Sequence, residues 1–157
     1  MLTASPALAA AVLAPGAAPA ARAPVRVDEP APGKATVVFY RKWSYAAGGL
    51  SFIVREGTAE LGRLSPGSYF VATVEPGLHT YTVHSERHDN MQLQVDAGEI
   101  YYVRFELEIG VLLYQPSLTP AQEWQFIQES PKLHLSKPLA GAAATNAAAP
   151  AANAAAP

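Results

Sequence analysis

The stretch YYVRFELEI at residues 101–109 decides the fold class of this chain. Its apolar side chains fall at every second position, as Tyr101, Val103, Phe105, Leu107 and Ile109. Charged side chains stand between them at Arg104, Glu106 and Glu108. Because successive side chains of a strand point to opposite faces of a sheet, this alternation predicts a strand with one buried and one wet face.

The same period of two continues on both sides of this stretch. Residues 91–95 alternate in the same way, and Thr36–Tyr40 is apolar on both faces, which predicts a central strand. Further short strands are expected at residues 50–55, 59–64, 68–75, 78–85, 111–115 and 133–135.

Turn chemistry separates these strands. Ser65–Ser68 and Glu75–Leu78 each place Pro at the second turn position and Gly at the third, which favours type II turns. Glu56–Thr58 and Ala97–Glu99 are expected to be hairpin connections. Evenly spaced breaks of this kind predict a mainly β protein, an antiparallel β-sandwich of about seven to nine short strands.

One C-terminal α-helix is expected to pack on the sandwich. Thr119 is the expected N-cap, Pro120 suits the first helical position, and Gln122 completes a capping box. Three apolar side chains then share the face that we expect to be buried: Ala121, Trp124 and Ile127. Tyr102 is expected to point to the strand face opposite the one that carries Tyr101 and Val103. It therefore lies either on an outer face of the sandwich or beneath this helix.

Composition divides the chain into three parts. Residues 1–33 are rich in Ala and Pro and are expected to be a signal-peptide remnant and linker. Residues 137–157 are mainly Ala, Pro and Asn and are expected to be a disordered tail. Residues 34–136 hold both Trp, all seven Tyr and all five Phe, so they are expected to form the single folded domain.

Charge and motifs exclude several function classes. The net charge of −2 provides no electrostatic footprint for nucleic acid. The chain has no Cys, which excludes thiolate catalysis and sulfur-ligated zinc. No phosphate loop, dinucleotide fingerprint or serine-hydrolase motif occurs, so we expect no cofactor and no enzyme activity. No apolar run approaches the ~20 residues of a membrane span.

The N-terminal run LTASPALAA at residues 2–10 resembles the end of a secretory signal. Ala7–Ala9 fits an A-x-A cleavage pattern, but the first basic residue is Arg22. Either the start site lies upstream, or the run is a disordered arm. We expect a periplasmic or secreted protein, with a cytosolic domain carrying two disordered arms as the alternative.

One polar loop holds ligand types suited to a metal. His84, Glu86, His88 and Asp89 offer imidazoles and carboxylates for zinc or copper, or for hydrolytic chemistry. The alternative interpretation, which we favour, is a solvated hairpin tip between two strands.

A second candidate site is the loop that follows the first strand. Trp43 and Tyr45 lie beside Gly48 and Gly49, and exposed aromatic side chains on such loops bind partners or stack on sugar rings. The favoured alternative is that Trp43 folds back and caps one end of the core. Glu106 and Glu108 share one strand face, where carboxylates serve either acid–base chemistry or, more often, solubility.

Four segments together resemble the bacterial domain-of-unknown-function family 2846. They are Ala35–Arg41, Leu61–Phe70, Glu75–His79 and Ala97–Val103. The resemblance extends over nearly the whole expected domain, including the helix, and the Pro-Gly-x-His turn is more distantly similar to PEGA-type sandwich modules. It implies a small β-sandwich of the cell envelope, often on lipoproteins, with no established activity. Without Cys this chain cannot be lipidated, which implies a free periplasmic or secreted form.

The residues that carry the resemblance match the requirements of folding. They are Gly62, Gly67, Tyr69, Pro76, Gly77, His79, Gly98 and Tyr101. The glycines permit turn geometry, Tyr69 and Tyr101 fill the core, and His79 tethers a turn by a hydrogen bond. We therefore expect a non-enzymatic interaction or structural module of the envelope. Its partner would be a protein or a glycan, bound through a sheet edge or the aromatic loop.

Overall fold

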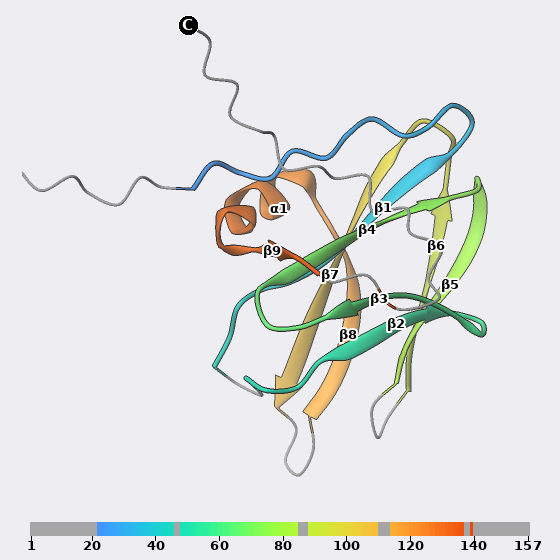
Figure 1. The fold of residues 1–157 in the computed structure, drawn as a ribbon. Helices are drawn as coiled ribbons and strands as arrows, with labels where there is room; N and C mark the ends of the chain where they lie inside the picture. The colour runs from blue at the N-terminus through green and yellow to red at the C-terminus, as the bar shows by residue number, and fades with distance from the viewer. Residues whose placement is uncertain (1–21, 46–47, 85–87, 110–113, 137–138, 140–157) are drawn as a thin grey trace, which may run out of the picture.

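Strand β1 (Ala35–Arg41) is buried along its whole length at the centre of the larger of two sheets. The computed structural model describes residues 22–45, 48–84, 88–109, 114–136 and 139. In it, two sheets pack face to face and one short helix lies on the outer side of the larger sheet (Figure 1). The expected central strand, the mainly β class and the C-terminal helix are confirmed.

The larger sheet has five strands in the order β8-β7-β1-β4-β9. The partners of β1 are β4 (Ser68–Val74), β7 (Ile100–Ile109), β8 (Tyr114–Ala121) and β9 (His134–Leu135). β1 pairs with β4 in the antiparallel sense, but β1 with β7 and β4 with β9 are parallel pairs. The sandwich is therefore mostly, and not wholly, antiparallel.

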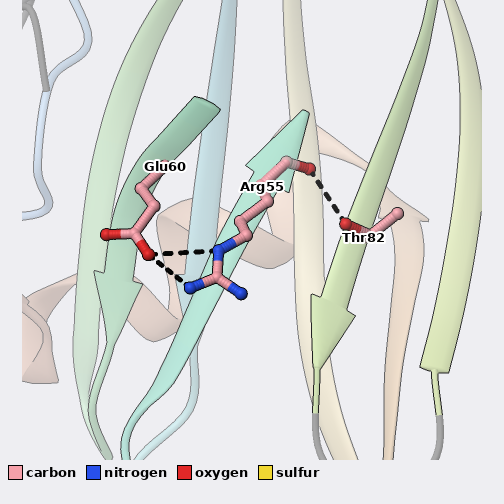
Figure 2. A network of polar contacts seen from close by, with 3 residues as sticks. All are labelled: Arg55, Glu60 and Thr82. Atoms are coloured by element: carbon pink, nitrogen blue, oxygen red, sulfur yellow. Dashed lines mark hydrogen bonds and ion pairs between the residues drawn. The ribbon is translucent and has the colours of Figure 1, made fainter. Parts of the chain in front are cut away.

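The smaller sheet has four strands in the order β3-β2-β5-β6, all antiparallel. Its strands are β2 (Phe52–Glu56), β3 (Ala59–Leu64), β5 (Gly77–His84) and β6 (His88–Val95). On it, Arg55 Nε donates to Glu60 Oε1 at 3.1 Å, and Thr82 Oγ1 donates to the Arg55 carbonyl at 3.5 Å (Figure 2). These polar contacts link three neighbouring strands, β3, β2 and β5.

The main core lies between the two sheets and is organised by aromatic contacts. Phe39 of β1 stacks on Phe70 with ring centroids 5.0 Å apart. The edge of Tyr81, from the opposite sheet, meets the same Phe39 ring at 5.0 Å. All three rings are at most 2% exposed, so this contact seals the two sheets together.

A second core lies on the other side of β1, beneath helix α1 (Glu123–Glu129). Phe126 of the helix is buried against the rings of Tyr40, Tyr69 and Tyr102, with centroids 5.2, 6.0 and 5.1 Å away. Tyr102 therefore packs under the helix, which decides between the two alternatives. Because β1 has a core on each side, its sequence is apolar at both odd and even positions.

The N-terminal arm contributes to this second core. Val25 and Val27 pack against it, and the Val25 N–H donates to Ser130 Oγ at 3.0 Å. The arm, blue in Figure 1, passes over the end of α1 before it enters β1. Residues 22–33, expected to be linker, thus include side chains that the domain holds; residues 1–21 and most of 137–157 lie outside the described residues.

Helix α1 begins later than expected, and its buried face is different. Thr119 and Pro120 are not a helix start, because they belong to β8, which pairs with β7 as far as Ala121 opposite Tyr102. The N-cap is Gln122, whose N–H donates to the Gln125 side chain at 2.8 Å.

The side chains expected to face the sandwich point mostly to solvent. Trp124 and Ile127 are 58% and 43% exposed, and Phe126 is buried in their place. The later start rotates the helix so that Phe126 meets the three tyrosine rings. The short 3₁₀ turn Ser130–Lys132 then leads into β9.

Three of the glycine turns cross between the sheets. Ser65–Ser68 links β3 to β4, and Gly67 has φ +70°, as a type II turn requires. Glu75–Leu78 links β4 to β5. Ala97–Glu99 was expected to be a hairpin, but it joins β6 of one sheet to β7 of the other, so that expectation is wrong. Pairing partners settle this, because β7 pairs with β1 and β8. The strand expected at 111–115 begins at Tyr114 and runs to Ala121; residues 111–113 lie outside the described residues.

Gly62 has a packing requirement that a test can measure. A Cβ atom at this position would lie 2.5 Å from the Phe70 ring. We expect Gly62→Ala to lower the free energy of unfolding by about 1–3 kcal/mol, because the ring is locked in the core. Urea denaturation measures this, with Gly49→Ala as the control at a glycine that has open space around it. Equal stability of both variants would contradict the packing.

Candidate functional site

Arg41, the last residue of β1, holds the loop that follows it. The residue is 3% exposed, and its Nη1 donates to the Leu50 carbonyl at 2.6 Å. Its guanidinium carbon lies 5.4 Å from the Phe52 ring centroid and 5.3 Å from that of Phe105, within cation–π range. Burial lowers the pKa of Arg41. The guanidinium therefore joins the two ends of the loop at residues 42–51.

Two aromatic side chains stand on this loop. Trp43 is 47% exposed and Tyr45 is 88% exposed, and their rings meet edge to face at 4.2 Å. Trp43 covers the turn at Gly67, where a Cβ atom would lie 3.0 Å from Trp43 Cδ1. It belongs to neither core cluster, so it does not fill the end of the core. The loop presents the two rings as a pair at the surface.

A hollow of about 350 Å³ lies beside the aromatic pair. One wall is the end of β1 with Lys42 and Trp43, and the other is β7 from Arg104 to Glu108. Arg104 Nε lies 3.2 Å from Glu106 Oε1 within that wall. We call this hollow and the Trp43/Tyr45 pair the aromatic groove. It offers ring faces beside hydrogen-bonding groups of both charges.

The polar loop after β5 is only partly described. His84 and His88 are opposite one another in the β5–β6 register, and Glu86 lies outside the described residues. Asp89 is opposite Val83, a core residue, so it shares the inner face and not the face of His84. Its Oδ2 accepts from the Leu118 N–H at 2.8 Å. Among the described residues, no three His, Asp or Glu side chains are grouped to hold a metal ion.

His79 links the segment between β4 and β5 to the β2–β3 hairpin. Its Nε2 lies 2.7 Å from the Glu75 carbonyl, and its Nδ1 lies 2.5 Å from Glu56 Oε1. The Glu75 side chain in turn pairs with Lys34. Each ring nitrogen therefore has an oxygen within hydrogen-bond distance. With both nitrogens engaged, His79 is placed as a structural clasp.

Four other residues of the sequence motif lie in the core or in the connections between strands. Tyr101 lies beside the main core, and its hydroxyl accepts from the Asp96 N–H at 3.0 Å. Gly98 has φ +85°, and its N–H donates to the Lys34 carbonyl at 2.8 Å. Tyr69 belongs to the core under the helix. Gly77 has φ +141° and opens β5 directly after Pro76.

The sheet edges are partly occupied by side chains. Asp89 of β6 binds the Leu118 N–H on the edge strand β8, as given above. On the opposite side, Ser136 Oγ donates to the Arg63 carbonyl on edge strand β3 at 2.5 Å. β9, the other edge of the larger sheet, has two residues. Such features are typical of edges protected against strand addition.

The comparison with family models matches residues 31–116 to a family described as Protein of unknown function (DUF2846). The chain belongs to this family. The match begins before β1 and ends inside β8, so the DUF2846 region includes Arg41, the aromatic loop and His79 but ends before α1. The expectation that the resemblance includes the helix is therefore not met. Comparisons with curated proteins and with solved structures return no match.

The structure also describes no helix long and apolar enough to cross a membrane among the residues placed. Sequence reasoning identified the aromatic pair of this DUF2846 domain but missed the role of Arg41. The one signal in the sequence was that a charged residue, Arg41, directly continues the apolar run of β1. Its position between two aromatic rings is apparent only in three dimensions.

A polar cluster lies beneath helix α1 of the DUF2846 protein. Arg104 Nη2 lies 3.3 Å from Glu129 Oε1 of the helix, and the Tyr40 hydroxyl is buried beside them. That hydroxyl has no hydrogen-bond partner within the described chain. Burial, and then the charge of Glu129, raise the pKa of Tyr40 to about 12. The phenol is therefore held in its neutral form.

This shift predicts a loss of stability in alkali. Tyr40 binds its proton more tightly in the folded chain, so its contribution is complete below pH 10 and is lost as the pH rises through about 12. Tyr40→Phe should match the wild type at pH 8, because no hydrogen bond is lost, and should lose less stability between pH 10 and 12. Urea denaturation across this range measures both; parallel losses in the two proteins would contradict the prediction.

Proposed function

We propose that this DUF2846 protein is a non-enzymatic binding module of the bacterial cell envelope, and that the aromatic groove binds a glycan. The observation that carries the proposal is the exposed Trp43/Tyr45 pair held on a loop whose ends Arg41 joins. Exposing a large aromatic side chain to water is unfavourable in free energy, and such side chains mark interaction sites.

The groove supports binding better than the sheet edges do. The side chains of Asp89 and Ser136 are hydrogen-bonded to backbone groups of the edge strands β8 and β3. These backbone groups are then not free to pair with an added partner strand. By contrast, Tyr45 is 88% exposed, and its ring partner Trp43 lines the hollow. Loop side chains on a rigid sandwich are also where binding residues commonly lie.

The size and chemistry of the groove favour a glycan over a protein. Its volume of about 350 Å³ is at the small end for ligand sites and suits a compact ring-shaped group. The ring faces stack on the apolar face of a sugar. Lys42, Glu106 and Glu108 provide donors and acceptors for hydroxyl groups.

The non-enzymatic part of the proposal is supported by the pKa shifts. The residues with shifted pKa values are Tyr40, Arg41, Tyr69, Tyr81 and Tyr102. In each, burial is the largest cause. These groups are tyrosines and one arginine that the fold buries, so their shifts are explained by packing.

Binding to envelope glycan tests this function. Purified protein is co-sedimented with insoluble peptidoglycan and with insoluble envelope polysaccharide. We expect Tyr45→Ala and Trp43→Ala each to weaken binding at least about fivefold, because each removes a stacking face. The Tyr45 change should alter the free energy of unfolding by less than about 0.5 kcal/mol, since the ring is almost wholly exposed.

Trp124→Ala is the matched control. Trp124 is 58% exposed on α1, away from the groove, so its removal should leave glycan binding unchanged. Equal loss in the Trp124 and Trp43 variants, or no glycan binding by the wild type, would overturn the proposal. Capture of a protein by the groove instead would favour the protein partner.

The envelope location is a separate part of the proposal. It is supported by the signal-like run at residues 2–10, which lies outside the described residues. We expect the mature native protein to begin after Ala9, as an A-x-A site implies. Mass spectrometry of the native N-terminus measures this, and a mature chain that retains Met1 and Leu2 would contradict export by this route.

A further inference from the structure

Strand β7 extends beyond the strand that pairs with it on one side. Its pairing with β1 ends at Phe105, opposite Arg41, whereas its pairing with β8 continues as far as Ile109. On the other side of β1, strand β4 begins at Ser68, which also lies opposite Arg41. The larger sheet therefore has a notch, in which β7 after Phe105 has no strand beside it on the β1 side among the described residues.

The strand pairing fixes which backbone groups of β7 face the notch. The Thr36 N–H of β1 donates to the Glu99 carbonyl at 3.0 Å, directly before β7 begins. Because the N–H and C=O groups of successive strand residues point alternately to the two sides, the odd-numbered residues of β7 direct theirs toward β1. Leu107 is the first odd-numbered residue of β7 beyond the end of the β1 pairing, so its N–H and C=O face the notch.

The other neighbour of β7, strand β8, agrees with this alternation. Leu107 is opposite Pro116, which has no N–H to donate. The Leu118 N–H, opposite Phe105, points away from β7 and donates to Asp89 Oδ2 at 2.8 Å. The backbone groups of Leu107 therefore have no strand partner within the described part of the chain, and unpaired strand groups are a template for the hydrogen-bonding groups of a ligand.

The notch opens into the aromatic groove. Leu107 lines the hollow of about 350 Å³, and Lys42 and Trp43 line its facing wall. A ligand in this hollow therefore has an aromatic ring and an unpaired backbone N–H within reach. The unpaired stretch of β7 runs only from Glu106 to Ile109, which is at the short end for a strand, so a single amide group fits it better than an added strand does.

We propose that the glycan in the aromatic groove is an N-acetylated amino sugar, and that the Leu107 N–H donates a hydrogen bond to the oxygen of its acetamido group. This inference rests on the proposed glycan function and specifies which class of sugar is bound. An acetamido group has the same planar N–H and C=O as a peptide unit, so it takes the place of the missing strand. Its own N–H points in the opposite direction, to the wall that begins at Lys42, while the sugar ring stacks on the aromatic pair.

Two trisaccharides with the same linkage distinguish the acetamido group from the rest of the sugar. Triacetylchitotriose carries an acetamido group on the second carbon of each ring, and cellotriose carries a hydroxyl group there. We expect the full chain to bind triacetylchitotriose at least about fivefold more tightly in a calorimetric titration, because the shorter hydroxyl does not reach the Leu107 N–H. Tyr45→Ala should weaken the binding of both trisaccharides by a similar factor, because it removes a stacking face and leaves the notch unchanged.

The Leu107 amide provides a direct readout by NMR. In the free protein it should exchange with solvent at least about tenfold faster than the amide of Val103, which faces the same side of β7 but is paired with β1. Triacetylchitotriose should slow the exchange of the Leu107 amide and shift its signal, and it should leave Val103 unchanged. Cellotriose should leave both amides unchanged.

The outcomes separate this inference from the glycan function itself. Tighter binding of triacetylchitotriose with a change at the Leu107 amide supports it. Equal affinity for the two trisaccharides, or an unchanged Leu107 amide in the bound state, overturns it and leaves glycan binding intact. Co-sedimentation with insoluble envelope glycan that triacetylchitotriose does not displace overturns it in the same way.

Two further outcomes also overturn the inference. If neither the trisaccharides nor the insoluble glycans bind, the glycan function is lost together with it. A tetra-alanine peptide with blocked ends represents an added strand. If this peptide shifts the Leu107 amide and binds more tightly than triacetylchitotriose, the notch belongs to an extended peptide.

Discussion

The structure depends on the burial of strand β1 on both of its faces. One face carries Phe39 into the core between the sheets, and the other carries Tyr40 into the core beneath α1. A strand with two cores must be central, so β4 and β7 occupy its two sides. The helix and the N-terminal arm are then held by the same strand, because both cover the Tyr40 face.

The same strand positions the aromatic groove. Arg41 ends β1 and remains buried, and its guanidinium reaches across to the Leu50 carbonyl between two aromatic rings. A buried cation of this kind fixes backbone geometry, because its donors and its ring contacts have defined directions. Gly67 leaves the space that Trp43 occupies on the neighbouring turn. The buried Arg41 thus connects the core strand β1 to the surface loop that carries the aromatic pair.

Much of the fold followed from local patterns. The period of two at 101–109, the doubly apolar run at 36–40 and the Pro-Gly turns predicted strands and breaks that the structure contains. The same patterns misplaced the hairpin at 97–99 and the helix start at Thr119. Both errors concern where a segment goes after a break, and turn residues specify local φ and ψ but not the sheet that receives the next strand.

The sequence by itself determined that this chain is a β-sandwich and that Trp43 and Tyr45 are its loop aromatics, because alternation and turn chemistry are local properties. Only the tertiary structure decided the parallel pairing of β1 with β7 and the choice of Phe126 over Trp124 as the buried helix residue. These features arise from contacts between segments far apart in the chain, which no local pattern records.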